Sequence, residues 1–272
     1  HITSLTDTIC FNDDPALIDQ KLPGDLIPPT AKNLFFAWQD SSTGATWGTV
    51  RSTIKSYDPP AGLQKTTWYR RKVTSGMCID SSAIVRITVI PKITGNSIAN
   101  PADTICHGGV FADLLGAAGL GGGDNTYRYQ WQYSTTGTDG WTNATGTSTT
   151  SDYNPDETSP LFPGKLYFRR KVFSGSHNVC ADSSLAAVRV DWPAITGNTI
   201  TADEITCSGV GDPALISGPE PLNGAGSGTF LYSWQDSSRL HGWQDIAGFI
   251  KVPGTNYDPP VLTDTTAYRR IA

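Results

Sequence analysis

The chain repeats itself, and this restricts its folds more than any other feature, because a long fixed period is typical of tandem arrays. A phrase ending in cysteine opens each repeat: Asp7-Thr8-Ile9-Cys10, Asp103-Thr104-Ile105-Cys106 and Asp203-Glu204-Ile205-Thr206-Cys207. These cysteines are 96 and 101 residues apart. We therefore divide the chain into repeats at 1–92, 93–193 and 194–272, the third ending before its last strand.

Further phrases follow each opening cysteine in a constant order. They are a Trp-Gln pair (Trp38, Trp131, Trp234), a second Trp (Trp47, Trp141, Trp243), a Tyr-Asp/Asn-Pro phrase (Tyr57, Tyr153, Tyr257) and a double Arg (Arg70-Arg71, Arg169-Arg170, Arg269-Arg270). Similar junctions, Pro91 to Asn96 and Pro193 to Asn198, join consecutive repeats. The chain is therefore expected to be a segment cut from a longer array.

Within a repeat, short β-rich runs alternate with turn residues, which is typical of a β-sandwich. The composition agrees, since 22 of the 25 acidic residues are Asp, and Asp suits turns whereas Glu suits helices. About seven strands are expected in the first repeat, including 34–40, 66–74 and 83–90. We predict an all-β chain of tandem immunoglobulin-like β-sandwich repeats of about 100 residues.

The charge and hydropathy of the chain exclude two classes of partner. A net charge of −5 disfavours binding to nucleic acid or to an anionic membrane surface. No apolar run reaches the roughly 18 residues that a transmembrane helix needs. We expect neither nucleic-acid binding nor a membrane span.

The five cysteines indicate an oxidising compartment. We predict a bridge within each complete repeat, Cys10 with Cys78 and Cys106 with Cys180, because these pairs join equivalent points. Cys207 would then have its partner outside the chain. Recurring disulfides are typical of extracellular proteins, so we expect a location outside the cytoplasm.

The repeated aromatic and basic residues have structural interpretations with functional alternatives. The Trp of each Trp-Gln pair is expected in the core. The second Trp either caps the sandwich edge or forms a ligand platform at Trp47, Trp141 and Trp243. Strand alternation places Tyr69 and Arg71 on one face, so one Arg of each pair lies on the core side. Asp80 and Asp182 are its expected partners; bracing of a turn is the main interpretation and anion binding the alternative.

Catalytic patterns are absent from the sequence. The four His (His1, His107, His177, His241) occupy unrelated repeat positions, and there is no Gly-x-Ser-x-Gly. We expect no catalytic residues, no metal and no cofactor, with Ca²⁺ at Asn12-Asp13-Asp14 or Asp212 as the alternative to ordinary turns. The glycine runs at 119–123 and 224–228 open no helix, which disfavours a phosphate site. Asn143-Ala144-Thr145 fits the N-glycosylation pattern.

Taken together, these phrases resemble the immunoglobulin-like tandem repeats of very large Bacteroidota surface proteins, including gliding-motility adhesins and other type IX secretion cargo. The resemblance spans all 272 residues. It implies export, a cell-surface or filamentous location, and a stalk or adhesive role without catalysis. It also implies O-glycosylation after Asp, for which Thr8, Thr104 and Thr265 match.

The resulting hypothesis is a non-catalytic stalk segment of an extracellular adhesin or surface filament. Its expected partners are neighbouring repeats of the same chain, with self-association into a fibre and binding to surface glycans left open. The alternative is a carbohydrate-binding adhesive module that uses the second Trp row. A third hypothesis is an accessory region of an extracellular hydrolase.

Overall fold

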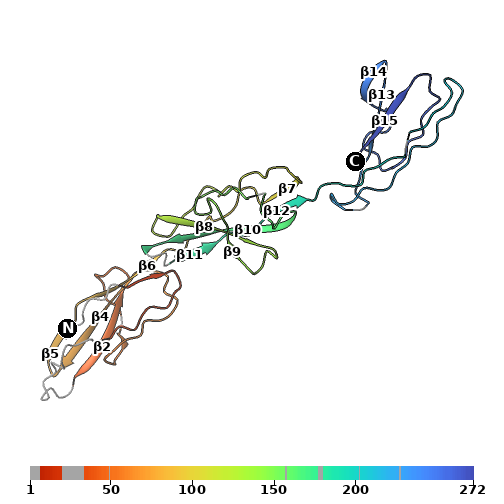
Figure 1. Cartoon of the computed structure of the whole chain (residues 1–272). Helices are drawn as coiled ribbons and strands as arrows, with labels where there is room; N and C mark the ends of the chain where they lie inside the picture. Colours follow the sequence, from red (N-terminus) through yellow and green to blue (C-terminus); the bar gives the residue numbers. More distant parts are fainter. Residues whose placement is uncertain are drawn as a thin grey trace. The chain divides into compact units, whose positions relative to one another are not determined.

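The computed structural model describes residues 7–19, 34–48, 50–156, 158–176, 180–201, 203–226 and 228–272. The chain forms two compact units. Figure 1 labels the strands except β1 and β3. One comprises His1–Pro101, Asp113–Asn154 and Tyr167–Ala187, and the other Ala102–Ala112, Pro155–Leu166 and Val188–Ala272. The predicted repeat boundaries stay a prediction, because the two units divide within the second repeat.

The first repeat forms one sheet in the order β1-β6-β4-β2-β3, with β5 paired to β4. Its strands are β1 (Asp7–Cys10), β2 (Phe35–Ser41), β3 (Val50–Ser52), β4 (Thr67–Ser75), β5 (Cys78–Ser81) and β6 (Val85–Ile90). β1 runs parallel to β6, and the other pairs are antiparallel. The β5 hairpin is absent from the strands expected from sequence.

The second repeat builds its sheet in the same order, β7-β12-β10-β8-β9, with β11 on β10. Its strands are β7 (Ala102–Cys106), β8 (Tyr127–Ser134), β9 (Thr142–Asn143), β10 (Gly164–Ser174), β11 (Cys180–Ser183) and β12 (Ala187–Trp192). In the third repeat β13 (Ser233–Ser238) lies between β14 (His241–Asp245) and β15 (Thr266–Ile271).

Isolated bridges recur at one position in each repeat. They pair Ile18 with Tyr57, Leu114 with Tyr153 and Ile216 with Tyr257. Each of these tyrosines contacts the Trp of the Trp-Gln pair, with ring centroids 5.6 to 5.8 Å apart. Trp38, Trp131 and Trp234 are at most 1% exposed. The prediction of a core Trp is therefore confirmed.

The sheets make the described chain all-β, and the first two repeats share one strand order. The sequence placed its recurring aromatic residues correctly because burial of large rings dominates the energetics of small sandwiches. The alternation along β4 is also as expected, since Tyr69 and Arg71 are both buried.

Candidate functional site at the repeat junctions

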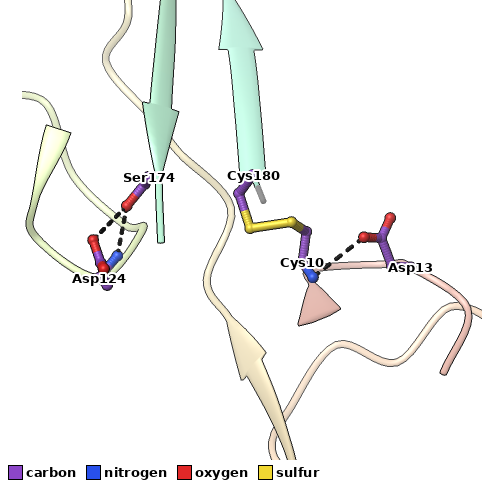
Figure 2. The surroundings of a disulfide bond; sticks show 5 residues. All are labelled: Cys10, Asp13, Asp124, Ser174 and Cys180. Carbon is purple, nitrogen blue, oxygen red and sulfur yellow. Dashed lines mark hydrogen bonds between the residues drawn. A yellow bond between two sulfur atoms is a disulfide. The ribbon is translucent and has the colours of Figure 1, made fainter. Parts of the chain in front are cut away.

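A disulfide joins the first repeat to the second. Cys10, at the end of β1, is bonded to Cys180, at the start of β11, and their Cα atoms are 5.4 Å apart (Figure 2). The bond spans a sequence separation of 170 residues. Both cysteines belong to the same compact unit.

The pairing predicted from sequence is therefore wrong. Cys78 and Cys106 carry free thiols, as does Cys207, and all three are exposed. Cys10 pairs in register with Ile90, beyond the end of β4 that begins at Thr67, whereas Cys78 follows the opposite end of β4. A nine-residue strand separates those ends by about 25 Å, far beyond the roughly 7 Å that a disulfide permits between Cα atoms.

The chain crosses from one repeat to the next through a segment held by backbone hydrogen bonds. Thr94 and Gly121 exchange bonds at 2.9 and 3.0 Å, and the Gly123 N–H donates to the Pro91 carbonyl at 2.9 Å. Gly122 has a φ of +70°, and a Cβ there would meet the Lys92 carbonyl. The glycine run thus allows the junction to lie directly on the following repeat.

The second junction is built in the same way. Thr196 and Leu222 exchange backbone bonds at 3.1 and 2.8 Å, and the Gly224 N–H donates to the Pro193 carbonyl at 3.1 Å. The two junctions, which differ only at Lys92 and Ala194, therefore adopt the same backbone pairing.

Each junction ends in an Asn that binds the second Arg of the following repeat. Arg170 Nε donates to Asn96 Oδ1 at 3.0 Å, and Asn96 Nδ2 donates to the Arg170 carbonyl at 3.2 Å. Arg270 and Asn198 make the same two bonds at 2.8 and 3.1 Å. The sequence shows these asparagines only as the last residues of the repeated junction phrases, and their repetition is the one signal of a role.

The core-side arginines are buried, and burial lowers the pKa of Arg71, Arg170 and Arg270. The expected partnership of Asp182 with Arg170 is indirect. That of Asp80 with Arg71 stays a prediction. Asp182 accepts a bond from Asn96 Nδ2 at 3.0 Å, so it holds the Asn that binds the Arg. Carbonyl oxygens and an amide oxygen accept hydrogen bonds from each guanidinium of the second and third repeats.

A second polar pair lies beside Cys180, at the residue in register with it. Ser174 Oγ donates to Asp124 Oδ1 at 2.7 Å and accepts the Asp124 N–H at 2.9 Å (Figure 2). The Ser174 hydroxyl, with the Thr126 backbone N–H, lowers the pKa of Asp124. This pair fixes the loop that follows the glycine run to the end of β10.

The Asp-Thr phrases have a structural role for their acid. Asp7 and Asp103 accept the backbone N–H of Ala16 and Ala112, at 3.4 and 2.9 Å. Glu204 takes the same position in the third repeat and accepts the Ala214 N–H at 2.8 Å, which explains the Asp-to-Glu departure there. Thr8, Thr104 and Thr265, the predicted O-glycosylation sites, all lie on the surface.

The second Trp of each repeat stacks on the first Arg of the double-Arg pair. The guanidinium carbons of Arg70, Arg169 and Arg269 lie 4.2, 4.3 and 4.4 Å from the ring centroids of Trp47, Trp141 and Trp243. The same arginines donate through Nε to Gln39, Gln132 and Gln235, the second residue of each Trp-Gln pair. One face of each ring is thus occupied; Trp47 and Trp141 are half-buried, and Trp243 is 43% exposed.

The described residues hold no group of three His, Cys, Asp or Glu side chains placed to bind a metal ion. Asp13, from the stretch considered for Ca²⁺, instead accepts the Cys10 N–H at 3.2 Å. His1 and His177 lie outside the part of the chain that the structure describes. Among the described residues, no helix has the length and apolar character needed to cross a membrane.

A family model for a domain of unknown function (DUF8696) matches residues 2–91 and, separately, 94–192. The chain belongs to the DUF8696 family. Each matched DUF8696 span contains one Trp-Gln pair and one double Arg. No curated protein matches the chain in sequence.

Solved structures similar to this DUF8696 chain include the FN1-FN3 domains of chicken CNTN1. They are 15% identical, with 86% of this chain and 83% of that chain covered and a TM-score of 0.31. Domains A168-A170 from titin are 12% identical, with 98% and 88% covered and a TM-score of 0.38.

Proposed function

We propose that this DUF8696 chain is a non-catalytic, load-bearing segment of an extracellular array of repeats. The observation that carries the proposal is the Cys10–Cys180 bond, which joins two consecutive repeats. An enzyme or a single binding domain has no need of a covalent bond between neighbouring sandwiches. A stalk gains from it, because the bond resists separation of the repeats.

The position of the bond supports a mechanical role. Tension applied to the two ends of the chain passes through Cys10, across the disulfide and out through Cys180. The residues between the two cysteines lie outside this path. They include the whole sheet of the first repeat from β2 to β6 and most of the second. Pulling therefore leaves these strands unloaded while the bond is intact.

A disulfide fits an oxidising location. The finer assignment, a stalk of a gliding-motility adhesin or another type IX secretion cargo of Bacteroidota, is supported by the resemblance of the repeated phrases. In that setting the surface positions of Thr8, Thr104 and Thr265 suit O-linked glycans. Neighbouring repeats would be the principal partners, and no cofactor is required.

Labelling of intact native cells tests this function. An antibody against the chain should label unpermeabilised cells, and a non-reducing digest of the shaved surface protein should contain the Cys10–Cys180 peptide pair. Labelling that appears only after permeabilisation, together with free thiols at both positions, would overturn the proposal.

The second candidate function is glycan binding by the row formed by Trp47, Trp141 and Trp243. The partial exposure of Trp243, at 43%, favours it. The stacked arginines argue for a structural use of the same rings, since a sugar would have only the opposite face. Binding on a glycan array that Trp243→Ala abolishes would establish this function, and unchanged binding or none would exclude it.

A further inference from the structure

The core-side arginines of the three repeats differ in one respect. In each repeat Nη1 of this Arg donates to the carbonyl two residues before the buried Tyr: Arg71 to Lys55 at 2.7 Å, Arg170 to Ser151 at 3.2 Å and Arg270 to Thr255 at 3.0 Å. This half of each guanidinium is therefore satisfied in the same way.

In the second and third repeats the other half of the guanidinium is satisfied by the junction. There Nε donates to the junction Asn, and Nη2 donates to the carbonyl of the next residue, Ser97 or Thr199. In the first repeat Arg71 is 5% exposed, and its Nε has no hydrogen-bond partner among the described residues. The aromatic rings of Phe36 and Trp38, 5.1 and 5.8 Å from the guanidinium carbon, do not replace that acceptor. A buried, unpaired donor of a charged group is costly, and native proteins rarely leave one.

A second feature of the first repeat points to the same absent partner. Cys78 begins β5 and pairs in register with Ser75, as Cys180 begins β11 and pairs with Ser174. Cys180 is bonded to the first cysteine of the preceding repeat, whereas Cys78 is free and exposed. In the second repeat, Arg170 binds the junction Asn and Cys180 bonds the cysteine of the preceding repeat. The first repeat has the equivalent residues, Arg71 and Cys78, but Arg71 Nε has no partner among the described residues and Cys78 is free.

We propose that the first repeat carries an acceptor site for the junction that joins another repeat of the same kind ahead of it, with Arg71 binding the junction Asn and Cys78 bonding the first-position cysteine of that preceding repeat. The occupant is the Thr-Gly-Asn phrase of the junction between the first repeat and a repeat joined ahead of it. A second copy of this chain does not supply it, because Asn96 and Asn198 already bind Arg170 and Arg270. The inference rests on the proposed array, and generalises its disulfide: the first cysteine of one repeat bonds the second cysteine of the next.

The test extends the full chain at its N-terminus. Ile-Thr-Gly-Asn is added directly before His1, which places the Asn ten residues ahead of Cys10, as Asn96 is ahead of Cys106. The matched control carries Ile-Thr-Gly-Ala. Both extensions are also made with Arg71→Lys, which keeps the charge and removes Nε. The readouts are calorimetric unfolding and amide hydrogen exchange of peptides from β4.

With native Arg71, we expect the Asn extension to raise the Tm of the first repeat by roughly 4 to 8 °C over the Ala control and to slow exchange across β4. With Arg71→Lys the two extensions should give equal values. Equal Tm and exchange for both extensions with native Arg71 would overturn the acceptor site, as would a dimer of the unextended chain in which Arg71 is engaged. Surface labelling of native cells decides the array function independently of either result.

Discussion

Asn96 and Arg170 hold each other through two hydrogen bonds, Arg170 Nε to Asn96 Oδ1 at 3.0 Å and Asn96 Nδ2 to the Arg170 carbonyl at 3.2 Å. Arg170 is 1% exposed, so loss of the amide oxygen leaves its buried, charged Nε–H donor without an acceptor. We expect Asn96→Ala to lower the free energy of unfolding by about 1–3 kcal/mol, measured by urea denaturation. Asn154→Ala, at an exposed position, is the control and should change it by less than about 0.5 kcal/mol. Equal effects of the two variants would contradict the assigned role.

The glycine run 119–123 packs closely against the junction, and within it Gly122 has the least space for a Cβ atom. Gly122→Ala adds a Cβ at a φ of +70° that meets the Lys92 carbonyl, whereas Gly146→Ala adds one at +67° with open space around it. Gly146→Ala therefore measures backbone strain alone, at about 1 kcal/mol. Gly122→Ala should exceed it by at least about 1 kcal/mol in thermal unfolding. If the two variants were equally stable, close packing of the junction would be refuted.

The thiols of the native protein are expected to divide into two classes. Alkylation without reductant should label Cys78, Cys106 and Cys207, because these three are free and exposed. Cys10 and Cys180 should be recovered as one cross-linked peptide pair by mass spectrometry. Recovery of Cys10 linked to Cys78 would restore bridges within repeats and contradict the structure.

The disulfide should stabilise the folded chain because it lowers the conformational entropy of the unfolded chain. Closing a loop of 170 residues is worth about 5 kcal/mol in the chain-entropy model. Cys10→Ser should therefore lower the Tm clearly, whereas Cys78→Ser, which removes a free thiol, should leave it nearly unchanged. Calorimetry on both variants separates the bond from the chemistry of the substitution, and a Cys10→Ser protein as stable as Cys78→Ser would argue against the bond.

Asp124 gives the junction a defined dependence on acid. The Ser174 hydroxyl lowers the pKa of Asp124 in the folded state, so the unfolded chain binds more protons at low pH. The resulting stabilisation is present above the ordinary Asp pKa and is lost as the pH falls through the lower folded pKa. Asp124→Asn should flatten the fall in Tm below about pH 4. Ser174→Ala should do the same. An unchanged pH profile in both variants would show that Asp124 does not cause the loss of stability in acid.

The sequence predicted the features that depend on a local pattern of residues: the repeats, the core Trp residues and the buried face of a strand. The period located the repeats, and the Trp-Gln pairs located the core, because large apolar rings are buried whatever the connection between strands. Strand alternation likewise placed Arg71 on the buried face. Spacing distinguished the first cysteine of each repeat from the second, but the pairing predicted from it was wrong.

The pairing depended on topology that the sequence does not show. Cys10 and Cys78 are equivalent points of one repeat in order, yet they lie at opposite ends of β4 once β1 runs parallel to β6. Similarly, the Arg170 partner came from Asn96, 74 residues away, instead of the nearby Asp182. To predict contacts at the junctions, one must know the direction in which the chain leaves each sheet, and the sequence alone does not show that direction.

Single-molecule pulling on the two termini tests the load-bearing account most directly. While the Cys10–Cys180 bond is intact, only the residues outside the 170-residue separation should extend. Addition of reductant should release about 560–610 Å of further contour length, at 3.3–3.6 Å per residue. Cys78→Ser should behave in the same way, and Cys10→Ser should show the full length without reductant. Equal contour lengths for the oxidised and reduced protein would contradict a disulfide that carries the load between repeats.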